Sequence, residues 1–66
     1  MPKKIGQLKA MLQKAGFTLR PGKASHTVWT HPKVNKAVIL SGKDGDDAQA
    51  YQEKHVARKI RESEEP

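Results

Sequence analysis

The chain has 66 residues, of which 35% are hydrophobic and 30% charged, so it has room for one domain with one small core. It contains no cysteine, which excludes disulfides and thiolate metal sites and favours an intracellular, cytoplasmic protein. No apolar run approaches the roughly 20 residues of a membrane span, and the N-terminus lacks a signal-peptide core, so no membrane partner is expected.

The first predicted element is an amphipathic helix within the stretch KKIGQLKAMLQKAGF. Its apolar residues are spaced by three, four and three positions and form one stripe, namely Ile5, Leu8, Leu12 and Ala15. Gly16 is predicted to end this helix in a left-handed conformation. Gly6 lies within the helix and lowers helix stability by about 1 kcal/mol relative to alanine. A close approach by another backbone would explain why glycine occupies this position.

Three short strands are predicted next, over residues 17–20, 25–31 and 36–40. Pro21 and Gly22 are predicted to end the first strand and separate it from the second, and a turn at Pro32 to Asn35 precedes the third. The third strand, KAVIL, is apolar enough to be the best buried.

A polar loop, SGKDGD, follows at residues 41–46, and Asp44 or Asp46 is predicted to cap a second helix. The partly apolar stripe of this helix comprises Ala48, Tyr51, Val56 and Ile60. The order and the short connections predict an α+β domain, α-β-β-β-α, with a three-stranded antiparallel sheet and two helices on one face. We expect a single domain over residues 1–61 and a disordered acidic tail over residues 62–66.

The second strand leaves two orientations open, because both Val28 and Trp29 are suitable core residues. If Trp29 packs on the helices, His26 points outward. If Val28 is the core residue, His26 lies on the helix side near the edge of the sheet. An outward Trp29 would be able to stack on a nucleic-acid base, although packing is the commoner role of a lone tryptophan.

Positive charge is concentrated in the first two thirds of the chain, and the net charge is +6. Residues 1–43 contain nine Lys or Arg and no Asp or Glu, whereas residues 44–66 contain four Lys or Arg and all seven acids. A basic segment of this kind favours contact with a polyanion such as RNA. A basic surface with no specific ligand is the alternative.

His26 is the candidate catalytic residue. The three histidines lack metal-ligand spacings, so no metal or other cofactor is expected. Every acid lies after residue 43, so a catalytic triad with Ser25 would have to be assembled through the tertiary fold. RNA cleavage by the ribose 2′-hydroxyl needs only proton transfer and charge stabilisation. His26 suits that chemistry because Arg20 and Lys23 are close in sequence as phosphate ligands, although an ordinary surface histidine is the alternative. His55 is expected to be an interface or half-buried residue.

The sequence has, in this order, a helix ending in KAGF, a short strand, a basic glycine-containing loop, and a Ser-His pair that opens a strand ending in His-Pro. In the order of these motifs the chain resembles the HicA toxin family. The resemblance covers roughly residues 4–41. It implies a fold like that of double-stranded-RNA-binding domains and a metal-independent endoribonuclease of a type II toxin–antitoxin system, which cleaves mRNA. It also implies a HicB-like antitoxin as protein partner. His26 corresponds to the catalytic histidine, and the expected RNA-binding residues are Arg20, Lys23, Ser25 and Trp29.

Two residues depart from the Gly-Ser-His signature of that family. Ala24 stands in place of the glycine, and Thr27 stands where a second histidine or a basic residue is frequent. If the loop needs a positive φ at residue 24, alanine strains it. The alternative function is a non-catalytic RNA-binding or antitoxin-binding module with the same fold. A homo-oligomer is a further option that the sequence leaves open.

Overall fold

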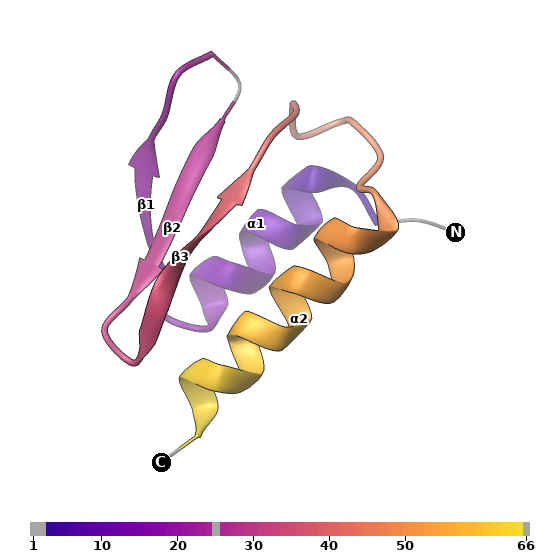
Figure 1. The fold of residues 1–66 in the computed structure, drawn as a ribbon. Coiled ribbons are helices and arrows are strands. Elements are labelled where there is room, and N and C mark those ends of the chain that lie inside the picture. Colours follow the sequence, from indigo (N-terminus) through magenta and orange to yellow (C-terminus); the bar gives the residue numbers. More distant parts are fainter. Residues whose placement is uncertain (1–2, 25, 66) are drawn as a thin grey trace.

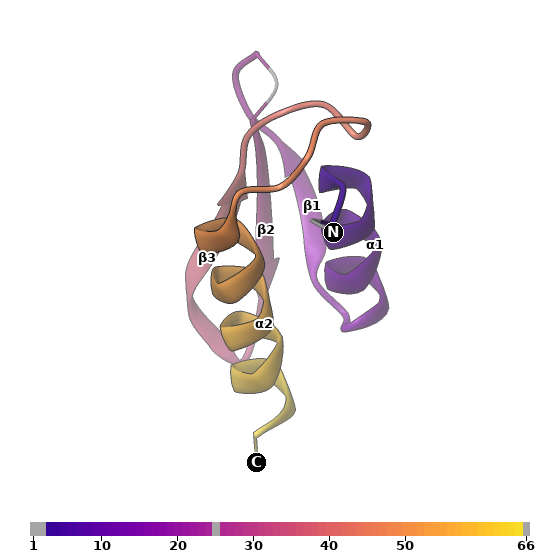
Figure 2. The ribbon, with the colours of Figure 1, turned by 90° about the vertical axis from the view of Figure 1, so that its right-hand side faces the viewer.

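A computed structural model describes residues 3–24 and 26–65 of the chain and has the expected α-β-β-β-α order. The elements are α1 (Ile5–Lys14), β1 (Thr18–Pro21), β2 (Thr27–His31), β3 (Val34–Leu40) and α2 (Ala50–Glu64). The strands form one antiparallel sheet in the order β1-β2-β3. Both helices pack on the same face of this sheet (Figures 1 and 2), which confirms the predicted architecture.

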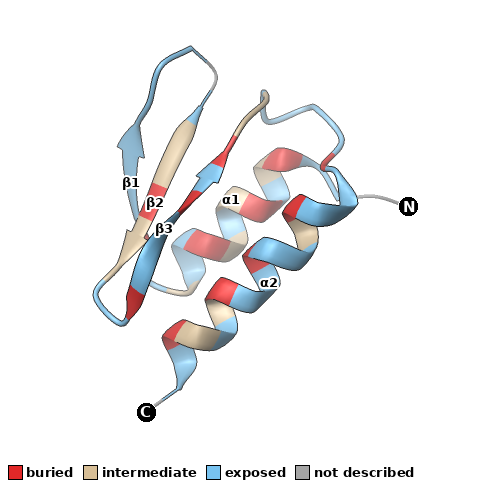
Figure 3. Ribbon diagram, in the orientation of Figure 1, coloured by how far each residue is buried: buried red, intermediate tan, exposed pale blue. Residues whose placement is uncertain are grey.

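The core lies between the helices and the inward face of the sheet (Figure 3). The predicted stripe of α1 is confirmed, since Ile5, Leu8 and Leu12 are buried. Opposite them lie the strand residues Trp29, Val38 and Leu40. Trp29 is only 3% exposed, so the sheet adopts the orientation in which Trp29, not Val28, packs on the helices. Neither helix in the described ranges is long and apolar enough to cross a membrane.

The third strand begins two residues earlier than expected. Val34 is buried and pairs with His31, so the predicted four-residue turn is reduced to Pro32 and Lys33. The Lys33 backbone N–H donates to Nδ1 of His31 at 3.0 Å, and the His31 ring lies 5.0 Å from that of Phe17. His31 therefore closes the hairpin, as a strand-ending residue should.

Helix α2 differs from its predicted stripe. Tyr51 is 68% exposed, and the buried positions are Gln52, Val56, Lys59 and Ser63. Two of the polar side chains have partners for their polar atoms. Gln52 Nε2 donates to the Ser41 carbonyl at 3.3 Å, and Lys59 Nζ contacts Glu62 at 3.4 Å. A stripe with so few apolar residues is hard to recognise from hydrophobic periodicity.

The C-terminal boundary also differs from the expectation. Helix α2 continues to Glu64 and so includes the first three residues of the segment 62–66 that was expected to be a disordered tail. Ser63 is buried, and its hydroxyl donates to the Ile60 carbonyl at 2.6 Å, which holds the last turn against the rest of the helix.

The acids of the loop after β3 do not cap α2, which begins at Ala50. The backbone N–H of Gln49 instead donates to Oε1 of Gln52 at 2.8 Å. The loop packs on the N-terminus of α1, where the carbonyl groups of Asp44 and Asp46 accept hydrogen bonds from Gly6 and Ile5 at 3.0 and 2.9 Å. Two otherwise unpaired helix donors are thereby satisfied.

Both glycine predictions for α1 are confirmed. Gly16 follows the helix with φ +94°, in the left-handed region. Gly6 is where the loop comes close, since a Cβ atom on it would lie 3.2 Å from the carbonyl oxygen of Asp44. The absence of a side chain at Gly6 therefore permits the hydrogen bond between the helix and the loop.

We expect Gly6→Ala to lower stability by about 1 kcal/mol, because the added methyl group pushes a hydrogen-bonded backbone away and outweighs the gain in helix propensity. Urea unfolding followed by circular dichroism measures this change. Gly45→Ala is the matched control, since a Cβ there meets nothing within 4 Å, and it should change stability by less than about 0.5 kcal/mol. A Gly6→Ala protein more stable than wild type would contradict the close-approach explanation.

Candidate functional site

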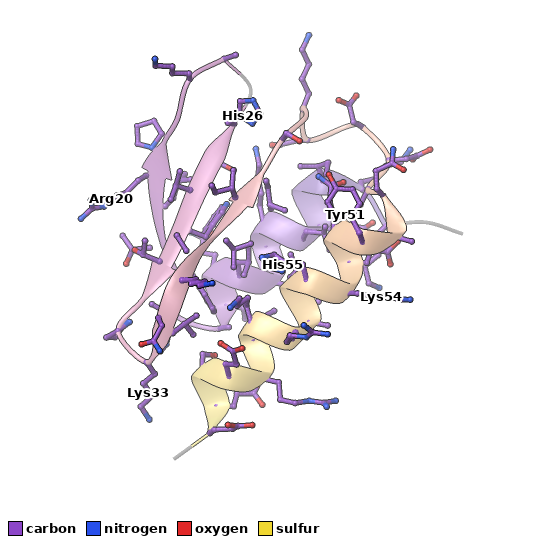
Figure 4. All side chains as sticks on the ribbon, viewed as in Figure 1. Arg20, His26, Lys33, Tyr51, Lys54 and His55 are labelled. Carbon is purple, nitrogen blue, oxygen red and sulfur yellow. The ribbon has the colours of Figure 1, made fainter. Side chains whose placement is uncertain are left out.

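His26 lies at the end of the hairpin turn that joins β1 to β2, one residue before β2 begins. Two backbone hydrogen bonds of 3.0 Å fix its main chain: its N–H donates to the Lys23 carbonyl, and its carbonyl accepts from Gly22. Its side chain is exposed, and Figure 4 shows it at the upper end of the sheet. The hairpin therefore presents the imidazole to solvent on a fixed backbone.

The imidazole lines an open pocket of about 410 Å³, which we call the His26 pocket. Its walls come from the β1–β2 hairpin, from α1 and from the loop after β3. They comprise Lys9, Leu19, Pro21, Gly22, Ala24, His26, Thr27, Gly42, Lys43 and Asp44. Two segments that are far apart in sequence, α1 and the loop after β3, thus each place a lysine in the pocket that the histidine lines.

The charged groups of the His26 pocket are Lys9, Lys43 and Asp44. Lys9 Nζ donates to Oδ1 of Asp44 at 2.7 Å, and this lysine side chain is only 23% exposed. The carboxylate thus holds one ammonium group at the wall of the pocket. Two cations beside an imidazole suit a phosphate ligand, because ammonium groups bind phosphate oxygens while imidazole transfers protons.

The structure separates the predicted RNA-binding residues. Arg20 lies between Leu19 and Pro21, which line the His26 pocket, so the alternation of a strand directs Arg20 to the other face. Figure 4 shows it at the outer edge of β1, away from His26. Lys23 is exposed in the hairpin turn beside the pocket. Ser25 lies outside the described residues.

Trp29 is a core residue, so the prediction that it contacts RNA is wrong. It is 3% exposed, and its Nε1–H donates to the Thr27 hydroxyl at 3.1 Å. Neither face of the indole is open to a base. Its place in the sheet is that of a packing residue, which is the commoner role of a lone tryptophan.

Ala24 has φ +54°, the only positive φ of a non-glycine residue in the described ranges. It occupies the second position of the turn that the Lys23–His26 backbone hydrogen bond closes. Hairpin turns of the primed types need a positive φ at this position, and glycine supplies it without strain. For an L-residue this conformation costs roughly 1–2 kcal/mol, so strain is stored two residues before His26.

We expect Ala24→Gly to raise the free energy of unfolding by about 0.5–1 kcal/mol, since relief of the strained φ exceeds the entropy cost of glycine. The matched control is Ala10→Gly on the exposed side of α1, which should lose about 1 kcal/mol. Chemical denaturation of the three proteins gives the comparison. Equal losses in both variants would show that residue 24 is not strained.

The other histidines lie outside the His26 pocket. His31 is engaged in the β2–β3 hairpin, and His55 is exposed on α2 rather than half-buried. Among residues 3–24 and 26–65, no group of three or more His, Cys, Asp or Glu side chains gathers in a way that could hold a metal ion.

Comparison with known proteins places the chain in a family. The HicA toxin of bacterial toxin–antitoxin systems matches residues 5–61, which include every helix and strand from α1 to the greater part of α2. The chain belongs to this HicA toxin family, and membership implies an antitoxin partner. No curated protein and no solved structure matches the chain.

Proposed function

We propose that this toxin is a metal-independent endoribonuclease that cleaves mRNA and uses His26 as general acid/base. The observation that carries the proposal is the exposed imidazole in a pocket that also contains the ammonium groups of Lys9 and Lys43. Membership of the toxin family and the basic first two thirds of the chain support it.

In the proposed reaction the 2′-oxygen of a ribose bonds to the adjacent phosphorus, and the bond from phosphorus to the 5′-oxygen breaks. A proton leaves the 2′-hydroxyl, and another is delivered to the 5′-oxygen. His26 performs one of these transfers, and solvent water performs the other. Lys9 and Lys43 stabilise the negative charge that accumulates on the non-bridging phosphate oxygens.

Asp44 has a specific part in this proposal. Its contact with Lys9 at 2.7 Å occupies the ammonium group in the free protein. Phosphate oxygens would compete with this carboxylate for the same donor. Lys23, at the rim, would bind a flanking phosphate, and Ser25 remains a predicted RNA contact. Arg20 would meet RNA only beyond the pocket.

Replacing His26 by alanine should reduce cleavage of single-stranded RNA in EDTA by about 10²–10⁴-fold, the usual contribution of general acid–base catalysis. His55→Ala is the matched control, because His55 is also exposed but lies outside the His26 pocket, and it should keep wild-type activity. Product formation on denaturing gels gives the rates, and circular dichroism checks the fold.

Three results would count against the proposal. Equal cleavage by wild type and His26→Ala would exclude His26 as the catalyst. Loss of all cleavage in EDTA would exclude a metal-independent reaction. RNA binding without any cleavage would favour the non-catalytic module.

Lys43→Ala should weaken RNA binding and reduce the slope of log K against log salt by about 0.7, the value for one lost contact to a single-stranded phosphate. Lys43 is preferred to Lys9 because no described ion pair is broken with it. Fluorescence anisotropy with a labelled RNA 20-mer at several salt concentrations measures the slope. The control is Lys33→Ala, at the opposite end of the sheet (Figure 4), which should leave the slope unchanged. Equal slopes for wild type and Lys43→Ala would show that Lys43 does not contact RNA.

A further inference from the structure

A second open pocket lies between β3 and α2 and has a volume of about 480 Å³. Its lining comprises Ala37 and Ile39 from β3 and Tyr51, Lys54, His55 and Arg58 from α2. We call it the β3–α2 pocket. It shares no lining residue with the His26 pocket, so the two are separate surfaces of the molecule.

The β3–α2 pocket gathers exposed apolar side chains. Ile39 is 61% exposed and Tyr51 68%, and the described chain has only one other large exposed hydrophobic residue, Leu19. Single exposed apolar residues are ordinary, but an aliphatic and an aromatic residue that line one pocket are typical of an interaction surface. Tyrosine is also among the residues that contribute most to protein interfaces.

The charge of this pocket is positive. The cations Lys54 and Arg58 line it, and no acidic residue does. Figure 4 shows Tyr51 on α2 and, about one turn further along the helix, the neighbouring residues Lys54 and His55. Arg58 also lines a neighbouring basic pocket with Arg61, so the cationic surface continues along the helix. A partner for this surface must therefore carry negative charge.

An acidic protein fits the surface better than RNA does. A third pocket lies between these two, since its lining includes Gly42 of the one and Tyr51 of the other. Asp46 and Asp47 also line it. An RNA strand that continued from the His26 pocket to Tyr51 would have to pass these two carboxylates. The exposed aliphatic side chain of Ile39 offers no recognition to a phosphate, but it is readily buried by an apolar side chain of a protein.

We propose that the β3–α2 pocket binds an acidic segment of the antitoxin. One apolar side chain of that segment packs between Ile39 and Tyr51, and its carboxylates face Lys54 and Arg58. Because β3 is an edge strand of the sheet as described, an extended segment has room to run beside it. The proposal rests on membership of the toxin family and not on the proposed RNA cleavage.

The test measures binding directly. The probe is the purified cognate antitoxin, titrated against the full chain by isothermal calorimetry. Arg58→Glu and Tyr51→Ala should each weaken binding at least tenfold, whereas Tyr51→Phe, which keeps the ring, should bind within about threefold of wild type. Lys33→Glu is the matched control, because it makes the same charge change on a distant exposed lysine, and it should leave the affinity unchanged.

Three outcomes would overturn the proposal. Wild-type antitoxin affinity in both Arg58→Glu and Tyr51→Ala would place the contact elsewhere. Loss of binding to a 20-mer oligouridylate in these variants, with antitoxin binding intact, would make the pocket an RNA surface. An equal loss of antitoxin affinity in Lys33→Glu and Arg58→Glu would show that the net charge of the protein, and not the β3–α2 pocket, determines binding. None of these results depends on whether His26 cleaves RNA.

Discussion

The structure depends on how the loop after β3 attaches to the start of α1. The carbonyl groups of Asp44 and Asp46 accept hydrogen bonds from the first turn of the helix, and the Ala48 N–H donates to the Lys3 carbonyl at 2.7 Å. The carboxylate of Asp47 pairs with Lys4, as that of Asp44 does with Lys9. This attachment joins the N-terminal helix to the loop between β3 and α2 and brings groups from both to the pocket that contains His26.

Much of the fold could be predicted from the sequence because α1 and the strands follow simple periodicities. The stripe of Ile5, Leu8 and Leu12 is buried as its spacing indicates. Helix α2 was harder, since its inward residues are mostly polar and Tyr51 faces out. Local sequence rules predict that the acids of the preceding loop cap α2, whereas in the structure the backbone of this loop contacts α1, which is distant in sequence.

The candidate site was predictable only in part, for the same reason. The local sequence indicates His26 as a candidate, because it shows a histidine beside a basic turn. Lys9 and Lys43 reach it through the tertiary structure, and no local pattern connects them to it. Conversely, Arg20 is near His26 in sequence but faces the other side of the sheet. The glycine-like backbone of Ala24 shows that the expected constraint on the turn is real.

Helix α2 is anchored by little apolar surface. On its inward side only Val56 is a fully buried hydrophobic residue, with Ile60 partly buried beside it. The helix should therefore detach from the sheet at a lower free energy than global unfolding requires, as a separate cooperative unit. Cellular proteases cut such transiently opened segments, so the lifetime of the free toxin would be set by how often α2 opens. Any ligand that bridges α2 and β3 would lengthen that lifetime while it is bound.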